Sequence, residues 1–358
     1  MKAVILRNSR LVLDEVPDPV PLPGTVLVRT LACGICGSDL HAATHMHRMV
    51  ETQQKAGSPF SLDPSRDIVM GHEFCAEVLD YGPGSAHSFP VGTRVCAVPV
   101  SLGTTGMQTI GYSNEFPGGY GERMLLMEQL LLPVPNGLAT HHAALTEPMA
   151  VGAHAVACAG MTPSDVPLVL GCGPIGLAVI ASLKLAGASP IIAADFSPAR
   201  RALAERMGAD IVIDPARNSA WTRWEEAANP DGIDPNDPMT FLGLGPQLRP
   251  GVVFECVGVP GVMAQIFENA MRATRVVIVG VCMERDQIEP LYALQKELSV
   301  RFVLGYTPDE FAATLCHIAE GRIDVAPLVT GRVGLDGVAG MFEELRSPER
   351  HAKVVVEP

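Results

Sequence analysis

The sequence predicts a two-domain α/β protein, and three observations support that prediction. The chain has 358 residues, which is too long for one compact core and suits two domains. Up to about residue 150, short apolar runs alternate with Gly and Pro breaks, as in a mostly-β domain. From about residue 151 to 306, continuous apolar strands alternate with amphipathic helices, which indicates a doubly wound parallel sheet covered on both faces.

The expected elements follow these patterns in chain order. Three early runs have the length and residue types of strands: GTVLVRTLAC (24–33), FCAEVLDYG (74–82) and GTRVCAVPVS (92–101). Strands and helices then alternate to the end of the chain, in VPLVLGCGPIGLAVI (166–180), PARRALAERMGAD (198–210), GVVFECVG (251–258), RVVIVGV (275–281), PDEFAATLCHIAEG (308–321) and AKVVVEP (352–358).

Charge and composition narrow the classes of function. The net charge is −13, so a nucleic-acid backbone or an anionic membrane surface would repel the protein. No apolar run approaches the roughly 18 residues that span a bilayer, and the first residues resemble a strand rather than a secretory signal. The nine cysteines are odd in number and scattered, unlike a disulfide framework. We therefore expect a cytoplasmic protein with mostly free thiols and a small-molecule partner.

A dinucleotide-binding motif opens the second region. The run LVLGCGPIG places glycines directly after a strand and at the start of a helix. Gly171 permits a tight turn, Gly173 lets a pyrophosphate approach the backbone, and Gly176 lets helix and strand pack closely. The predicted phosphate-binding loop comprises Gly171, Gly173, Pro174, Ile175 and Gly176. A glycine turn in a cofactor-free α/β domain is the alternative.

The residue that follows the next strand favours NAD over NADP. Asp195 lies about twenty residues beyond the glycines, where a carboxylate binds ribose hydroxyls and repels a 2′-phosphate. Arg200 and Arg201 follow closely and weaken this preference. NADP therefore remains the alternative cofactor.

Four residues of the first region predict a catalytic zinc site. Cys36, the GHE pair His72 and Glu73, and Glu147 of TEP are zinc-ligand types, and they come from three separate segments. A structural zinc knuckle would instead draw its ligands from close CxxC pairs. We expect Glu73 to bind mainly in the resting state, since a third negative ligand would make the metal a poorer Lewis acid. Taken singly, Cys36 or His72 is more often a core residue.

These motifs carry a family resemblance. ACGICGSDLH, GHE, TEPMAVGAHA, LGCGPIG and FECVG resemble the zinc-containing medium-chain alcohol dehydrogenases, and Glu147 resembles their polyol (sorbitol-type) branch. The resemblance implies a GroES-like catalytic domain over 1–150 and 307–358, with a Rossmann domain over 151–306. It also implies a homodimer or homotetramer.

The residues after Cys36 predict a proton relay. Zinc would lower the pKa of an alcohol hydroxyl, and Ser38 is placed to accept its proton. By resemblance, the path continues through the nicotinamide ribose to His41. Asp39 is expected to orient His72. A simple turn or helix cap is the alternative for Ser38 and Asp39.

The resemblance assigns further cofactor contacts. Arg200 resembles a basic partner of the adenosine ribose, and Val257 belongs to the FECVG motif. Gly280 and Val281 are expected to line the nicotinamide pocket. Lys353 is expected to reach the pyrophosphate.

Two departures from the family pattern stand out. The segment over 100–120 has no cysteine, whereas many relatives bind a structural zinc there, so we predict one catalytic zinc per subunit and no structural zinc. The segment over 43–69 is unusually long and is expected to be a loop, either a lid or substrate wall or a surface loop. Its His45 and His47 are interpreted as solvent-facing, with an HxH metal pair as the alternative.

The predicted function is reversible hydride transfer between an alcohol and NAD. Glu147 favours polyols or secondary alcohols, while Met46, Met49 and Met107 favour a hydrophobic or aryl alcohol. The rival enzyme is a zinc-free, NADPH-dependent quinone or enone reductase of the same fold. A non-enzymatic nucleotide sensor would not need the residues from Ser38 to His41. Zinc content and cofactor preference separate these alternatives.

Overall fold

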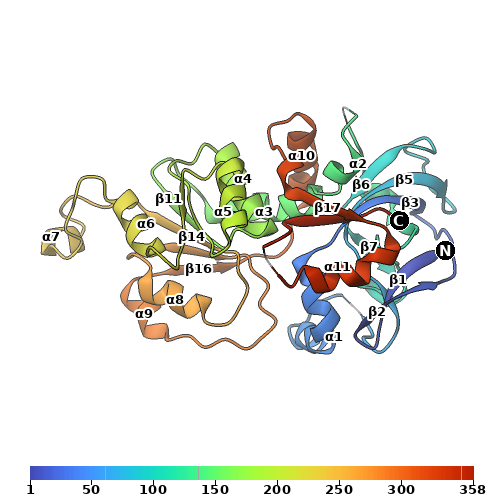
Figure 1. The fold of residues 1–358 in the computed structure, drawn as a ribbon, viewed down its shortest axis with the longest axis horizontal. Coiled ribbons are helices and arrows are strands. Elements are labelled where there is room, and N and C mark those ends of the chain that lie inside the picture. Colours follow the sequence, from blue (N-terminus) through green and yellow to red (C-terminus); the bar gives the residue numbers. More distant parts are fainter. Residues whose placement is uncertain (61, 136, 348) are drawn as a thin grey trace. The chain divides into compact units, whose positions relative to one another are not determined.

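The computed structural model describes residues 1–60, 62–135, 137–347 and 349–358, and it divides into two compact units (Figure 1). Unit 1 comprises Met1–Pro148 and Thr307–Pro358, and unit 2 comprises Met149–Tyr306. The sequence prediction placed these boundaries after residues 150 and 306. Within the described ranges, no helix combines the length and apolar character of a membrane span.

Unit 1 is built on a seven-stranded sheet, as expected for a mostly-β domain. Its strand order is β10-β6-β5-β3-β18-β17, with β9 also paired to β3. These strands are β3 (Thr25–Gly34), β5 (Glu73–Tyr81), β6 (Arg94–Ala97), β9 (Arg123–Met127), β10 (Leu131–Pro133), β17 (Val329–Val333) and β18 (Lys353–Val356). Smaller sheets join β1 (Lys2–Arg7), β2 (Arg10–Glu15) and β4 (Ile68–Val69), and β7 (Val100–Gly103) and β8 (Gly106–Thr109).

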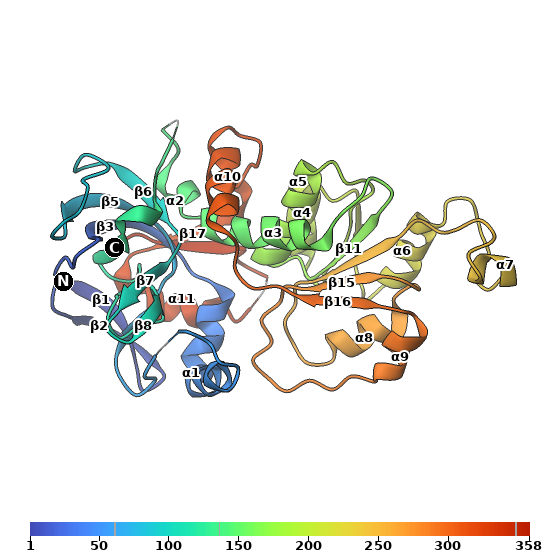
Figure 2. The same cartoon turned by 180° about the vertical axis from the view of Figure 1, so that it is seen from behind.

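Strand β3 organises the functional part of unit 1. Its alternating apolar residues, such as Val26 and Val28, are fully buried in the core. It pairs antiparallel with β5 and also with β18, which comes from the end of the chain. Figure 2 shows the C-terminus beside β3. The end of β3, the start of β5 and the start of β18 therefore meet at one place.

The helices of unit 1 include one correction to the sequence prediction. They are α1 (Gly37–Lys55), α2 (Thr140–Ala143), α10 (Pro308–Ala319) and α11 (Val338–Glu344), with short 3-10 turns η1 (Glu128–Leu130), η2 (Ala326–Leu328) and η3 (Leu335–Gly337). The segment over 43–69 was expected to be a loop, but α1 occupies it as far as Lys55. Helix formation buries Met46 and Val50 against the core, which explains the difference.

Unit 2 confirms the predicted doubly wound sheet. Six parallel strands lie in the order β13-β12-β11-β14-β15-β16, a 3-2-1-4-5-6 arrangement when counted within the unit. They are β11 (Val166–Leu170), β12 (Ile192–Ala194), β13 (Ile211–Ile213), β14 (Gly251–Glu255), β15 (Arg275–Ile278) and β16 (Ser299–Phe302). In this topology, ligands bind beyond the carboxyl ends of β11 and β14.

Helices cover both faces of this sheet, with α4 and α5 on one face and α8 on the other (Figures 1 and 2). The helices are α4 (Pro174–Leu185), α5 (Pro198–Met207), α6 (Ala220–Ala228), α7 (Pro238–Phe241), α8 (Val262–Asn269) and α9 (Pro290–Gln295); α3 (Thr146–Ala159) runs from the end of unit 1 into unit 2. Trp224 of α6 is fully buried, and its Nε1 donates to the Val166 carbonyl at 2.8 Å. This bond anchors α6 to β11.

Candidate metal centre and dinucleotide loop

Three predicted zinc ligands lie together in unit 1. The ligand atoms of Cys36, His72 and Glu73 are all within 4.8 Å of one another. The β3–β5 register brings them together, because it places Gly34 opposite Glu73. A Cβ on Gly34 would lie 2.0 Å from Glu73 Oε2, so only glycine leaves room for the carboxylate.

This group has the chemistry of a zinc site. Thiolate, imidazole and carboxylate are zinc's usual donors, and His72 and Glu73 are both buried. Burial by itself lowers the pKa of His72, but Asp39 and Cys36 outweigh it and raise that pKa well above its usual value. The negative surroundings that hold a proton on the imidazole would equally attract a cation.

Glu147 lies in the first turn of α3 and is buried. Its charge, with those of Glu73 and Cys36, helps to raise the pKa of Lys353 against the opposing effect of burial. The compact group contains only Cys36, His72 and Glu73 among the residues that the structure describes. Ligation by Glu147 therefore stays a prediction.

The structure corrects the assignment of Lys353 to the pyrophosphate. Its Nζ lies 2.7 and 2.8 Å from the two Glu73 carboxylate oxygens and donates to the Ile35 carbonyl at 3.1 Å. Only 2% of Lys353 is exposed. The pairing of β18 with β3 brings this ammonium beside Glu73. Lys353 thus neutralises a buried carboxylate of unit 1.

Asp39 is fully buried beside His72 and holds a network of hydrogen bonds. Its carboxylate accepts from Tyr112 Oη at 2.7 Å, from Tyr120 Oη at 2.6 Å and from the Cys36 N–H at 3.1 Å. Its Oδ1 lies 3.4 Å from His72 Nδ1, longer than a good hydrogen bond. Burial opposes ionisation, but His72 and the two tyrosines lower the pKa of Asp39 overall. Asp39 is also the N3 residue of the α1 capping box, so its position suits both the orientation of His72 and the capping of the helix.

Tyr112 and Tyr120 are site residues that the sequence reasoning missed. Both come from the cysteine-free segment that was interpreted only as the lack of a structural zinc. Two tyrosines next to glycines, in the runs GY and GGY, were the available signal. Nothing local in the sequence shows that both reach Asp39, more than seventy residues earlier.

Ser38 and His41 lie on the first turns of α1. The Ser38 hydroxyl is half-buried and lies 3.1 Å from Tyr112 Oη. His41 follows three residues later, on the same side of the helix, and is exposed. His45 and His47 are also exposed, as expected of solvent-facing residues.

In unit 2 the glycine loop has the expected backbone geometry. Gly171 adopts a φ of +86°, and a Cβ there would lie 2.8 Å from Val257 Cγ2. A Cβ on Gly176 would lie 1.8 Å from the Gly171 carbonyl oxygen, so helix α4 packs directly on the turn. Gly173 is the N-cap of α4, and no protein atom comes closer than 3.8 Å to its Cβ position. Pro174 and Ile175 begin α4; proline has no N–H, so the N–H groups that suit a phosphate in this first turn are those of Ile175 and Gly176.

Asp195 follows β12 and ties it to the glycine loop. Its two carboxylate oxygens accept from the N–H groups of Cys172 at 2.7 Å and Ser197 at 2.8 Å.

The adjacent arginines Arg200 and Arg201 of α5 differ in their partners. Arg201 forms an ion pair with Asp214 at 3.1 Å. Arg200 differs, because its buried Nε has no hydrogen-bond partner among the described residues and its guanidinium lies 3.8 Å from the Gly173 Cβ position. Arg200 is thus the basic group available to a ligand at this loop.

The ends of β14 and β15 carry the remaining predicted cofactor residues. The buried Glu255 carboxylate accepts from the Val257 and Gly258 N–H groups at 2.7 and 2.8 Å. A Cβ on Gly280 would lie 2.4 Å from the Gly258 nitrogen, so these two ends pack closely. Val257 and Val281 remain substantially exposed, as surfaces open to a ligand would be.

Comparison with known proteins identifies the family. Residues 22–136 match the alcohol dehydrogenase GroES-like domain, and residues 174–320 match the zinc-binding dehydrogenase family. The (R,R)-butanediol dehydrogenase of Bacillus subtilis (strain 168) is 32% identical over 368 aligned positions that cover 100% of both chains. The chain belongs to the zinc-type medium-chain alcohol dehydrogenase family.

Other members of this family are similar over the same length. The sorbitol dehydrogenase of Bacillus subtilis (strain 168) is 26% identical and covers 100% of this chain and 97% of its own. The crystal structure of the Bacillus subtilis 2R,3R-butanediol dehydrogenase aligns with a TM-score of 0.79 at 31% identity, covering 100% and 99% of the two chains. A zinc-binding dehydrogenase from Sinorhizobium meliloti 1021, bound to NADP, aligns with a TM-score of 0.78 at 27% identity over 100% and 99%. The predicted family and fold class are therefore confirmed.

Family membership makes this chain an oxidoreductase that interconverts alcohols and carbonyl compounds.

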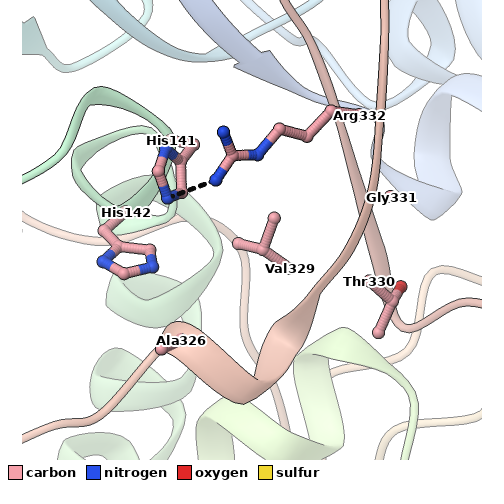
Figure 3. Close-up of a pocket in the computed structure, with 7 residues that line it drawn as sticks. All are labelled: His141, His142, Ala326, Val329, Thr330, Gly331 and Arg332. Carbon is pink, nitrogen blue, oxygen red and sulfur yellow. Dashed lines mark hydrogen bonds between the residues drawn. The ribbon is translucent and has the colours of Figure 1, made fainter.

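A hollow of about 300 Å³ on unit 1, shown in Figure 3, is lined by none of the predicted site residues. There Arg332 donates to His141 Nε2 at 2.8 Å, and its charge is opposed by Glu357 at 3.7 Å. Burial and the neighbouring Arg332 lower the pKa of His141 and His142. The hollow thus offers little net charge to a ligand.

Proposed function

We propose that the protein is a zinc-dependent, NAD-linked dehydrogenase of secondary alcohols that carry a neighbouring hydroxyl group. The observation that carries this proposal is the group of Cys36, His72 and Glu73 next to Ser38. Butanediol and sorbitol dehydrogenases among the relatives support a polyol-type substrate. The buried position of Met46 in the core of unit 1 removes part of the argument for an aryl alcohol.

The residues of unit 1 would divide the chemistry among them. Cys36, His72 and Glu147 would hold a zinc ion, which would supply Lewis-acid polarisation of the substrate oxygen. Ser38 would accept the hydroxyl proton, and the exposed His41 would release a proton to solvent. Asp39 would keep the His72 ring in its orientation. The dinucleotide would supply the hydride acceptor.

The ion pair between Glu73 and Lys353 supports the proposal that Glu73 is a reserve ligand. The negative charges of Cys36 and Glu147 balance a divalent cation, and Lys353 balances Glu73 separately. Glu73 can therefore leave a metal without remaining as an unpaired buried charge. One zinc ion per subunit is the stoichiometry that this arrangement and the cysteine-free segment over 100–120 favour.

Asp195 supports NAD as the preferred cofactor, while Arg200 is the feature that would suit a 2′-phosphate. The Asp195 oxygens are already held by two backbone N–H groups, which fixes the carboxylate at the end of β12. A fixed carboxylate there would bind ribose hydroxyls and repel a phosphate. Dissociation constants for NADH and NADPH test this assignment; tighter NADPH binding would contradict it.

Self-association is proposed through the edge of the unit 2 sheet. β16 is one of the two edge strands of this sheet, and its Phe302 is 66% exposed. An edge with unpaired backbone groups and exposed apolar side chains favours pairing with a second copy. Light scattering after size exclusion should give the mass of a dimer or tetramer, and Phe302→Lys should shift the protein to smaller assemblies.

The nine free cysteines suit the proposed cytoplasmic location.

One assay series tests the function. Purified protein is analysed for zinc, and a panel of vicinal diols, simple secondary alcohols and aryl alcohols is tested with NAD and NADP. We expect about one zinc per chain, and diol-dependent formation of NADH that a strong chelator removes. Zinc-free protein that reduces quinones or enones with NADPH would instead establish the alternative enzyme class.

A further inference from the structure

We propose that Tyr112 is a positioning residue that holds the Ser38 hydroxyl ready to accept a proton. The inference rests on the proposed role of Ser38 in the relay. Tyr112 Oη contacts both Ser38 Oγ at 3.1 Å and Asp39 Oδ1 at 2.7 Å. It thereby joins the proton acceptor to the carboxylate beside His72.

The backbone fixes Tyr112 in this position. Gly111 adopts a φ of +86°, and a Cβ there would lie 2.7 Å from the Gly71 carbonyl oxygen. The turn that carries Tyr112 is therefore pressed against the residue preceding His72. The Tyr112 N–H also donates to the Thr109 carbonyl at 2.9 Å, and the Tyr112 and His72 ring centroids lie 5.3 Å apart. Tyr112 is held against the metal-binding segment.

The single phenol proton of Tyr112 fixes the direction of its hydrogen bonds with Asp39 and Ser38. The Asp39 carboxylate accepts from three donors, one of which is Tyr112 Oη. A phenol has one proton, and Tyr112 donates it to Asp39 in the shorter of its two contacts. In the contact with Ser38, Tyr112 therefore accepts and Ser38 donates.

This direction of the hydrogen bond leaves Ser38 Oγ able to interact with the hydroxyl group of an alcohol. The Ser38 proton points towards Tyr112, and the remaining lone pairs on Oγ stay free to accept a hydrogen bond from an alcohol hydroxyl. When the alcohol proton passes to Oγ, the proton that Ser38 already carries leaves along the relay towards His41, so Ser38 remains a neutral hydroxyl. Without Tyr112 Oη the hydroxyl would sample its three staggered orientations, and in some of them its own proton would oppose that of the substrate. Removing the phenol oxygen should therefore slow proton transfer without changing substrate binding or zinc retention.

Tyr120 provides a matched comparison within the same network. It donates to the other Asp39 oxygen at 2.6 Å and is fully buried. Among the described hydrogen bonds, those of its hydroxyl do not include Ser38. Tyr120→Phe removes a donor to Asp39 and leaves the contact between Ser38 and Tyr112 in place.

The test uses Ser38→Ala, Tyr112→Phe and Tyr120→Phe, with each tyrosine variant also combined with Ser38→Ala. We expect Ser38→Ala to lower kcat about a hundredfold and Tyr112→Phe about tenfold, with KM unchanged. Once Ser38 is absent, Tyr112→Phe should cost less than about twofold more, because it acts through that hydroxyl. Tyr120→Phe should have the same effect in both backgrounds. Zinc retention against a chelator should be unchanged in Tyr112→Phe.

The possible results separate this inference from the proposed function. Ser38→Ala with normal turnover would overturn both the relay and the role of Tyr112. A slow Ser38→Ala variant in which Tyr112→Phe still costs about tenfold would overturn the role of Tyr112 alone. Loss of zinc from Tyr112→Phe would also overturn it, because Tyr112 would then act on the metal site through Asp39.

Discussion

The two units assemble their sites in different ways. In unit 2 the dinucleotide loop is almost contiguous, and its shape depends on backbone torsions and close approaches at Gly171 and Gly176. In unit 1 the candidate metal centre joins residues far apart in sequence, and side chains such as Lys353 and Tyr112 complete it. A backbone motif tolerates change at its neighbours but not in its glycines. A side-chain network depends on every charge having its partner.

The largest expected effect comes from removing a metal ligand of unit 1. Cys36→Ala should lose zinc and lower kcat/KM about a thousandfold, because Lewis-acid stabilisation is worth several kcal/mol. Zinc analysis and steady-state kinetics measure both effects. Cys33→Ala is the matched control, since Cys33 is fully buried at the end of β3 and should leave zinc in place. If the two variants lose zinc equally, the CxxC pair acts together and Cys36 is not the specific ligand.

The next largest effect is expected from breaking the buried ion pair between Lys353 and Glu73. Lys353→Met leaves the Glu73 carboxylate buried without its cation, which should lower the free energy of unfolding by about 3–5 kcal/mol. Denaturant unfolding measures this change. The double variant with Glu73→Gln should recover part of the loss, because the unpaired charge is gone. A Lys353→Met protein as stable as the wild type would show that the pair contributes little.

Unit 2 offers the corresponding test of a backbone motif. Gly176→Ala places a Cβ 1.8 Å from the Gly171 carbonyl oxygen and should destabilise the fold by about 3 kcal/mol. Gly173→Ala is its control, because the nearest protein atom would be 3.8 Å away. Its thermal stability should stay nearly normal, while NADH binding weakens about tenfold through a clash with the dinucleotide. Normal NADH affinity in Gly173→Ala would place the pyrophosphate elsewhere.

The same contrast explains how far the sequence could be interpreted. The glycine motif and the grouping of Cys36 with His72 were predictable, because each depends on a few neighbouring residues or on a characteristic residue type. The partner of Lys353 was not, since it lies 280 residues away and depends on which strands pair. Tyr112 was missed for the same reason. The length of α1 was missed because its polar composition resembles a surface loop, and only the packing of Met46 and Val50 shows that it is a helix.

A smaller effect is expected at Glu128, whose carboxylate holds the loop at Ala86 and Ser88 within unit 1. Glu128 accepts from the N–H groups of Ala86 and Ser88, each at 2.9 Å. Burial raises the pKa of Glu128, but the backbone hydrogen bonds from Ser88 and Ala86 outweigh it and leave that pKa below its usual value. Because the folded pKa is lower than the unfolded one, the stabilisation is complete above the unfolded pKa. It is lost as the pH falls through the folded pKa.

Glu128→Gln should therefore lower the free energy of unfolding by roughly 1–2 kcal/mol at pH 7, and the difference from the wild type should shrink towards pH 3. Unfolding curves across this range measure it. Glu225→Gln, an exposed change on α6 of unit 2, should show no such narrowing. A constant difference at all pH values would mean that Glu128 acts through its shape and neutral hydrogen bonds. Charged side chains would then matter to unit 1 mainly at the metal centre.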